Sequence, residues 1–109
     1  MSILNDTYRW VRNLRSGNFE QGQATLYDNC TSEFCCLGVL AVSCDVPLIE
    51  LIGYGLLTSL QGSDESFEAI KRALYVLDNI IVEQETLVEY NDSLQLTFNQ
   101  IADKIMEAI

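Results

Sequence analysis

The segment Phe34-Cys35-Cys36-Leu37-Gly38-Val39-Leu40-Ala41-Val42-Ser43-Cys44 is almost entirely apolar, and no charged residue occurs between Glu33 and Asp45. Such a run is stable in water only when neighbouring segments cover nearly all of its surface. We therefore interpret residues 34–44 as a buried central helix. Gly38 within this helix costs about 1 kcal/mol relative to Ala. A glycine at such a position indicates the close approach of another backbone.

The segments on either side have the apolar periodicity of amphipathic helices that could cover this run. Side chains that accept from backbone N–H groups, and glycines, mark their ends. The residues that we expect to begin or end these helices are Asn5 or Asp6 and Ser16-Gly17 for the first, Thr31 or Ser32 for the central helix, Asp45 with Pro47 for a short helix after it, Ser63 or Ser66 for the next, and Thr97 with Gln100 for the last.

The composition is that of a globular, helix-rich chain: 109 residues, 49% hydrophobic, with a single proline. Apolar residues recur at helical spacing in residues 67–81 and 98–109, and residues 83–90 continue as helix. Residues 17–33 form a long polar connection. We expect an all-α fold, a single helical domain spanning residues 1–109 that is built as a compact bundle of about five helices around the buried central helix.

The net charge of -10 is large for this size and unevenly distributed. Arg9, Arg12 and Arg15 are half of the six basic residues, so we expect one small basic ridge on an acidic body. Free nucleic acid and anionic membranes are poor partners for such a surface, whereas a basic protein is attracted to it. The longest apolar run is too short to span a membrane. We therefore expect the protein to work in the cytoplasm.

The sequence contains no histidine, which excludes histidine-dependent catalytic arrangements and Cys/His zinc sites. The four cysteines, Cys30, Cys35, Cys36 and Cys44, lack the paired spacing of a zinc site, so we expect reduced, mostly buried thiols. An enzyme that uses Cys35 or Cys36 is a weaker alternative, because it needs an arginine folded over the thiol. We expect no enzymatic activity, no metal and no cofactor.

Two surfaces are candidates for binding. Trp10 either packs at the edge of the core beside solvated arginines or forms an exposed Trp/Arg patch that anchors a partner. The acidic residues of the segment 83–92 either serve solubility or imitate the phosphate rows of a nucleic acid. The candidate binding residues are Trp10, Arg12, Arg15, Gln21, Gln23, Glu83, Glu85, Glu89 and Asp92.

Several short blocks of the chain together resemble a family of small uncharacterised bacteriophage proteins. The blocks are Trp10, Leu14-Arg15-Ser16-Gly17-x-Phe19-x-Gln21-Gly22, Leu26, Phe34-Cys35-Cys36-Leu37-Gly38-Val39-Leu40, Asn91-Asp92 and Phe98-x-x-Ile101-Ala102-Asp103-x-Ile105. This chain departs from the family pattern at Ala41, where the family has a third cysteine, and in its longer, more acidic middle.

This resemblance implies a phage origin but no activity. It makes the polar segment from Arg15 to Gln23, beside the Cys-Cys helix, the best candidate for a shared site. Alternatively, Arg15 and Gln21 satisfy backbone groups of the long connection.

Two functions are consistent with these features. The first is a non-enzymatic phage accessory protein that binds and modulates a host protein with a basic surface, in host takeover or anti-defence, with acidic nucleic-acid mimicry as one means. It would contact neither nucleic acid nor membrane directly, and self-association is left open. The alternative is a protein that binds or sequesters a nucleotide signal through Arg9, Arg12, Arg15, Gln21 and Gln23.

Overall fold

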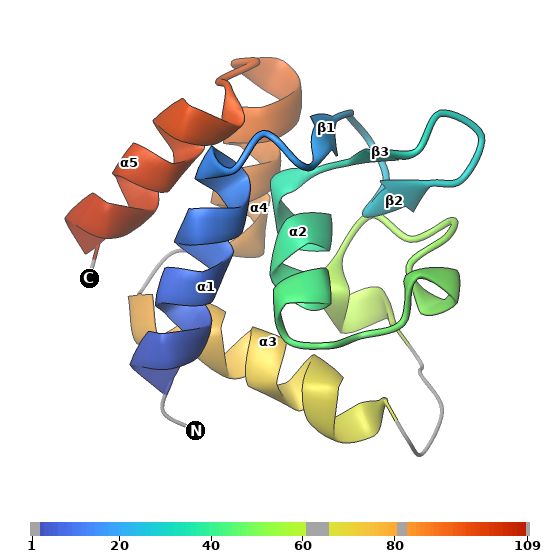
Figure 1. Ribbon diagram of the computed structural model, residues 1–109, viewed down its shortest axis with the longest axis horizontal. Helices are drawn as coiled ribbons and strands as arrows, with labels where there is room; N and C mark the ends of the chain where they lie inside the picture. The colour runs from blue at the N-terminus through green and yellow to red at the C-terminus, as the bar shows by residue number, and fades with distance from the viewer. Residues whose placement is uncertain (1–2, 61–65, 81–82, 109) are drawn as a thin grey trace.

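The central helix expected over residues 34–44 is present at the middle of the fold but spans only Cys36–Ser43, because Phe34 belongs to a strand (Figure 1). The computed structural model describes residues 3–60, 66–80 and 83–108. These residues contain five α-helices: α1 (Ile3–Arg15), α2 (Cys36–Ser43), α3 (Phe67–Ile80), α4 (Gln84–Val88) and α5 (Phe98–Ala108). They also contain two 3-10 helices of one turn each, η1 (Leu48–Glu50) and η2 (Leu57–Ser59), and the π-helical turn η3 (Glu89–Ser93).

Helix α2 is enclosed by the rest of the molecule. Helices α1, α3 and α4 all pack against it, and every residue of α2 except Val42 is buried. Gly38 lies directly against the chain at Leu26, where a Cβ on Gly38 would overlap the Leu26 carbonyl oxygen. The expected close backbone approach at this glycine is therefore confirmed. The absence of a side chain at Gly38 lets the backbone at Leu26, just before strand β2 (Tyr27–Asp28), lie in direct contact with the backbone of α2.

The all-α prediction is wrong, because the structure also contains a three-stranded mixed sheet. The strands are β1 (Glu20–Gln21), β2 (Tyr27–Asp28) and β3 (Glu33–Phe34), in the order β1-β3-β2, with β1 parallel and β2 antiparallel to β3. The sheet orders most of the segment expected to be a long connection. Strands of two residues leave no alternating pattern in the sequence, which is why periodicity did not reveal them.

Aromatic contacts support this small sheet. The Phe34 ring meets Phe19 edge-on at a centroid distance of 5.1 Å and Tyr27 at 4.7 Å. Phe34 is buried and is followed by Cys35 and then α2. The sheet thus holds the entry to the central helix in place, and it brings residues 20–24 close to the beginning of that helix.

The helix ends correct three of the expected caps. Helix α1 is already formed at Ile3, so Asn5 and Asp6 lie within it and neither is its N-cap. Neither Thr31 nor Ser32 caps α2: its N-cap residue is Cys35, which makes no side-chain capping bond. Asp45 does not start a helix. It lies just after α2 in the left-handed region (φ 71°), and Pro47 precedes the turn η1. The N–H of Asp45 donates to Val42 O and that of Val46 to Ala41 O, which closes the end of α2 as a Schellman motif.

Other expected ends are confirmed. Gly17 has φ 79° just after α1 ends. Thr97 and Gln100 form the reciprocal capping box of α5: Thr97 N donates to Gln100 Oε1 at 2.9 Å, and Gln100 N donates to Thr97 Oγ1 at 3.2 Å. Helix α3 begins at Phe67, directly after Ser66. Ser63, Ile81 and Ile109, which the sequence placed at a cap or on helix faces, lie outside the described residues.

Candidate functional site

Trp10 is part of the core. Its side chain is fully buried, and its indole N–H donates to the carbonyl oxygen of Cys36 at 3.0 Å. This bond satisfies the one polar atom of the ring. The exposed Trp/Arg patch therefore does not form, and the indole instead fixes α1 against the beginning of α2.

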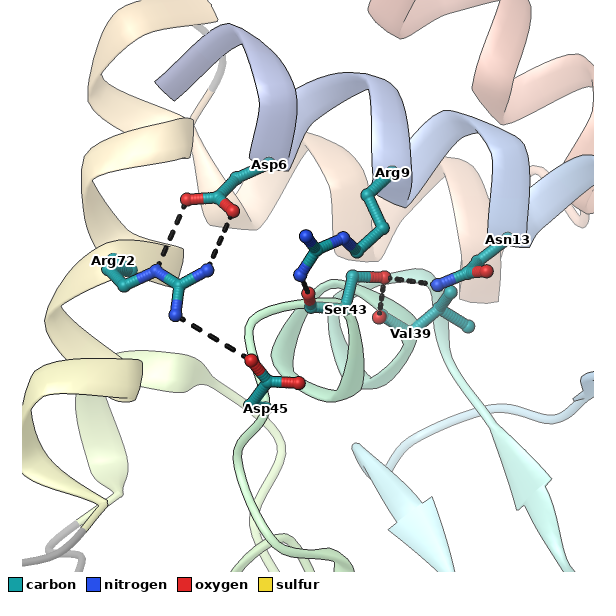
Figure 2. Close-up of polar contacts among 7 residues, drawn as sticks. All are labelled: Asp6, Arg9, Asn13, Val39, Ser43, Asp45 and Arg72. Atoms are coloured by element: carbon teal, nitrogen blue, oxygen red, sulfur yellow. Dashed lines mark hydrogen bonds and ion pairs between the residues drawn. The ribbon is translucent and has the colours of Figure 1, made fainter. Parts of the chain in front are cut away.

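The arginines of α1 point in different directions. Arg9 donates to the carbonyl oxygen of Ser43 at 3.1 Å, at the end of α2, as Figure 2 shows. Arg15 pairs with Asp103 on α5 at 2.8 Å. Arg12 is exposed and has no ion-pair partner in the described part of the chain. The three side chains therefore do not form the continuous basic ridge that their spacing suggested.

A second arginine joins three elements at the same end of α2 (Figure 2). Arg72 on α3 donates from NH2 to Asp6 Oδ1 at 2.7 Å and from Nε to Asp6 Oδ2 at 3.3 Å. Its NH1 lies 3.7 Å from Asp45 Oδ2. The Asp6 carboxylate is buried, and its hydrogen bonds raise the pKa of Arg72 further above its ordinary value. This group of contacts ties α1, α3 and the end of α2 together.

Asn91 connects the opposite end of α2 to distant segments. It is fully buried, and its Oδ1 accepts from Cys36 N at 3.3 Å and from Gln21 Nε2 at 3.1 Å. Its Nδ2 donates to Gly22 O and to Asp92 Oδ1, both at 2.8 Å. The amide of one side chain thus supplies the missing N-terminal cap of the central helix and holds the β1 segment against η3.

Gln21, Gln23 and Asp92 belong to this same cluster. Gln21 donates to Leu96 O at 2.7 Å and accepts from Phe98 N at 3.1 Å, which caps the first turn of α5. The alternative interpretation, in which Arg15 and Gln21 satisfy backbone groups of the long connection, is wrong: Gln21 bonds to backbone groups of residues 96 and 98, and Arg15 bonds to the Asp103 side chain. Gln23 donates to Asn91 O at 3.4 Å, and Asp92 Oδ2 accepts from Ala24 N at 3.1 Å. The cluster therefore holds the fold together.

The arginines and the glutamines line two separate hollows. Arg12 and Arg15 line a groove of about 590 Å³ between α1 and α5, together with Tyr8, Val11, Ser16 and Met106. Gln21 and Gln23 line a polar hollow of about 480 Å³ with Gly22, Glu33, Asn91 and Gln95. The structure thus places these arginines and glutamines around different hollows.

A third hollow gathers acidic side chains. It has a volume of about 530 Å³ and lies between α3 and α4. Glu83 and Glu85 line it, as does Asp78, which the sequence analysis missed. Glu89 does not line it but is exposed on the following turn. The described residues that line it are Thr58, Leu74, Leu77, Asp78, Glu83, Gln84 and Glu85, and none of these is Lys or Arg.

The floor and rim of this hollow differ in chemistry. Leu77 is buried and Leu74 half-buried, whereas Asp78, Glu83 and Glu85 are exposed. The side chain of Gln84 points to the protein, with Oε1 accepting from Leu57 N at 2.8 Å. Helical spacing could have placed Asp78 on the same face of α3 as Leu74, because it lies one turn beyond that residue. Its proximity to Glu83 depends on how α3 and α4 pack. This arrangement suits a cationic side chain with an aliphatic stem.

Three of the four thiols are buried. Burial raises the pKa of Cys35 to about 11, that of Cys36 well above its usual value and that of Cys44 to about 12. Arg72 and Arg9 lower the pKa of Cys44, but less than burial and Asp6 raise it. Cys30 is exposed. Raised pKa values disfavour the thiolate that nucleophilic chemistry needs.

The described residues lack a metal-binding cluster and a membrane-spanning helix. No group of three Cys, Asp or Glu side chains within residues 3–60, 66–80 and 83–108 is placed to hold a metal ion. Over the same ranges, none of the helices combines the length and the apolar character needed to cross a membrane.

Comparison with known proteins finds one similarity. Residues 5–50 match the model of a family described as a domain of unknown function (DUF8296). No curated protein and no solved structure matches the chain. The matched region covers less than half of the chain and runs from α1 through the sheet and α2 to η1. It includes Gln21, Gly22 and Cys36 but not Asn91, which contacts all three.

Proposed function

We propose that the chain is a non-enzymatic phage accessory protein that binds a basic segment of a host protein and thereby modulates that protein. The observation that carries this proposal is the hollow between α3 and α4, where Asp78, Glu83 and Glu85 rim a floor of Leu74 and Leu77. We call it the acidic hollow. The resemblance to small bacteriophage proteins supports the phage origin, and the raised thiol pKa values support the absence of thiol catalysis.

The chemistry of the acidic hollow favours a Lys or Arg side chain of a partner. The aliphatic stem of such a side chain would lie over Leu74 and Leu77, and its cationic group would reach the carboxylates of the rim. Charge-assisted hydrogen bonds are stronger than neutral ones, and the apolar floor keeps water from part of the contact. A hollow of about 530 Å³ has room for more than one such side chain.

The distribution of charge adds long-range attraction. Arg15 and Arg72 are paired with carboxylates of the same chain, and Arg9 is bonded to Ser43 O. These basic groups are therefore committed to the fold, while acidic groups dominate the charge of -10. A basic partner is steered toward such a surface, most strongly at low ionic strength. Imitation of nucleic-acid phosphates by Glu83, Glu85 and the nearby Glu89 is one form that this binding could take.

The proposal can be tested by quantitative affinity capture from host lysate with a double variant, Glu83→Gln/Glu85→Gln. A matched control, Glu20→Gln/Glu107→Gln, changes the net charge by the same amount at exposed sites outside the acidic hollow. We expect the wild-type protein to retain a basic host protein, the control to retain it nearly as well, and the hollow variant to lose most of it, about tenfold.

Two results would contradict the proposal. If the two double variants lose the captured protein equally, only net charge matters and the acidic hollow is not the site. If the wild-type protein retains nothing above a tag-only control even at low salt, where attraction between opposite charges is strongest, the chain does not act by binding a basic host protein.

A further inference from the structure

The groove between α1 and α5 is the most apolar of the surface hollows described above. Val11 is buried at its floor, while Tyr8 and Met106 are 48% and 41% exposed along its sides. Figure 1 shows α1 and α5 running side by side, and the two helices are in contact along their length. Large apolar side chains gathered around one groove lose contact with water when another surface covers it.

Basic residues line this groove and an acidic residue lies beside it. Arg12 and Arg15 line the groove on the α1 side. Asp103 on α5 is not among the lining residues, but its carboxylate lies 2.8 Å from the guanidinium of Arg15, and its side chain is 66% exposed. Arg12 has no ion-pair partner in the part of the chain that the structure describes. A surface that covers the groove therefore needs an acidic group opposite α1 and tolerates a basic group opposite α5.

A second copy of the groove meets both requirements. When two copies face each other across a two-fold axis that runs along the groove, each α1 lies over the α5 of the other copy. Arg12 then faces Asp103 of the partner subunit, and the apolar sides meet in the middle. An axis across the groove would place arginine over arginine. A purely acidic helix would match the α1 side but would be repelled by Asp103.

We infer that the α1–α5 groove is the interface of a symmetric homodimer, built by a two-fold axis parallel to the groove. This interface is closed: both copies use the same surface, so no unpaired copy of that surface remains to bind a third chain. It uses neither Glu83 nor Glu85, so each copy in the dimer would keep its acidic hollow. The inference is thus independent of the proposed function.

Long-range repulsion between two chains of charge -10 opposes this dimer. At low ionic strength the repulsion extends far, whereas at about 0.15 M salt the screening length is about 8 Å. The apolar contacts of Tyr8 and Met106 are not screened. We therefore expect the dimer to be weakest at low salt and to strengthen as salt rises, opposite to the behaviour expected for the basic partner of the acidic hollow.

The test is sedimentation velocity of the purified full chain over a range of concentrations, at about 0.02 M and 0.15 M salt. Tyr8→Lys places a charge in the groove, while Tyr75→Lys makes the same change on α3 at a tyrosine that is 54% exposed. We expect Tyr8→Lys to raise the dimer dissociation constant about 30-fold or more and Tyr75→Lys to leave it within about twofold. Arg12→Glu, which faces Asp103 of the partner subunit, should weaken the dimer about tenfold.

Each outcome bears on the inference. A wild-type chain that sediments as a monomer at all concentrations overturns it, as does equal weakening by Tyr8→Lys and Tyr75→Lys. If Arg12→Glu strengthens the dimer, the axis does not run along the groove and the inferred geometry is wrong. Circular dichroism of every variant shows whether the fold is kept, and both exposed tyrosine positions are expected to tolerate the change.

Discussion

The two ends of helix α2 are held by polar contacts of different kinds. At its beginning, neutral groups converge: Asn91 accepts from Cys36 N, Gln21 donates to Asn91, and the Trp10 indole donates to Cys36 O. At its end, charged groups converge: Arg9 donates to Ser43 O, and the Asp6–Arg72 pair lies beside Asp45 (Figure 2). A cation at the carboxyl end of a helix also interacts favourably with the helix dipole.

This difference predicts different responses to solvent and mutation. The amide contacts at the beginning of α2 contain no ion pair, although Asn91 Nδ2 also donates to the Asp92 carboxylate, so salt should affect them little. The charged contacts at its end include Arg72, whose side chain is 31% exposed, so salt should weaken them. Mutations at each end should therefore differ in how strongly they destabilise the protein and in how salt changes the loss.

Gly38→Ala should have the largest effect. The added Cβ would overlap the Leu26 carbonyl oxygen, and this backbone group cannot rotate away as a side chain would. We expect a loss of about 3 kcal/mol or more in the free energy of unfolding, measured by urea denaturation. Gly53→Ala is the control: it has open space but φ 86°, so only the backbone strain of about 1 kcal/mol applies. Similar losses in the two variants would contradict a close contact at Gly38.

Asn91→Ala should lower the free energy of unfolding by about 2–3 kcal/mol. It leaves Cys36 N, Gln21 Nε2 and Gly22 O without the partner that they have in the folded protein. The loss should be the same at about 0.05 M and 0.5 M salt, because no ion pair is removed. Asn79→Ala removes an exposed amide that donates to Tyr75 O and should cost no more than about 0.5 kcal/mol. A strongly salt-dependent loss at Asn91 would contradict the neutral character of this end.

The parts of the fold that the sequence predicted are those set by neighbouring residues. The uncharged run predicted the position of α2. Gly17 predicted the end of α1, and Thr97 with Gln100 predicted the capping box of α5. The sheet was missed because its pairs join backbone groups of two-residue strands. The cap of α2 was missed because Asn91 lies 55 residues from Cys36, a separation at which the sequence shows no pattern.

The same limit applies to the candidate site. Glu83 and Glu85 were found because they are close in sequence, but Asp78 joins them only through the packing of α3 against α4. Arg12 and Arg15 share a groove, yet Trp10, two residues before Arg12 in the chain, is fully buried in the core. A row of like residues on a helix predicts which side chains share a face. It does not predict which of them the rest of the fold covers.

Arg72→Met should cost about 2 kcal/mol, because it leaves the buried Asp6 carboxylate without its cation. Asp6→Asn/Arg72→Met, which removes both charges, should be more stable than the sum of the single changes predicts. The loss in Arg72→Met should shrink at about 0.5 M salt, unlike that of Asn91→Ala. Urea denaturation of the double-mutant cycle at two salt concentrations gives these quantities. Additive losses would show that Asp6 and Arg72 are not energetically coupled.

Alkaline pH should destabilise the protein through its buried thiols. The folded-state pKa of Cys44 is raised to about 12 from an ordinary value of 9.0. Above about pH 9 the folded chain therefore keeps a proton that the unfolded chain releases. The stability that the Cys44 thiol contributes is complete below about pH 9 and is lost as pH rises toward 12. Between pH 8 and pH 10, we expect the free energy of unfolding of Cys44→Ala to fall by about 1 kcal/mol less than that of the wild-type protein. Equal slopes with pH in denaturation experiments would contradict a protected thiol at this end of α2.

Asp45→Gly should have the smallest effect and the opposite sign. Asp45 follows α2 with φ 71°, a conformation that glycine adopts without strain. The change also removes a contact of 3.7 Å to Arg72, but the Asp45 side chain is 71% exposed, and such a pair contributes little. We expect a net gain of about 0.5 kcal/mol, larger at high salt. Asp45→Asn removes the same charge yet keeps a side chain that tolerates this conformation, so it measures the ion pair alone. If the glycine variant is less stable than the asparagine variant, the backbone at this end of α2 is not strained.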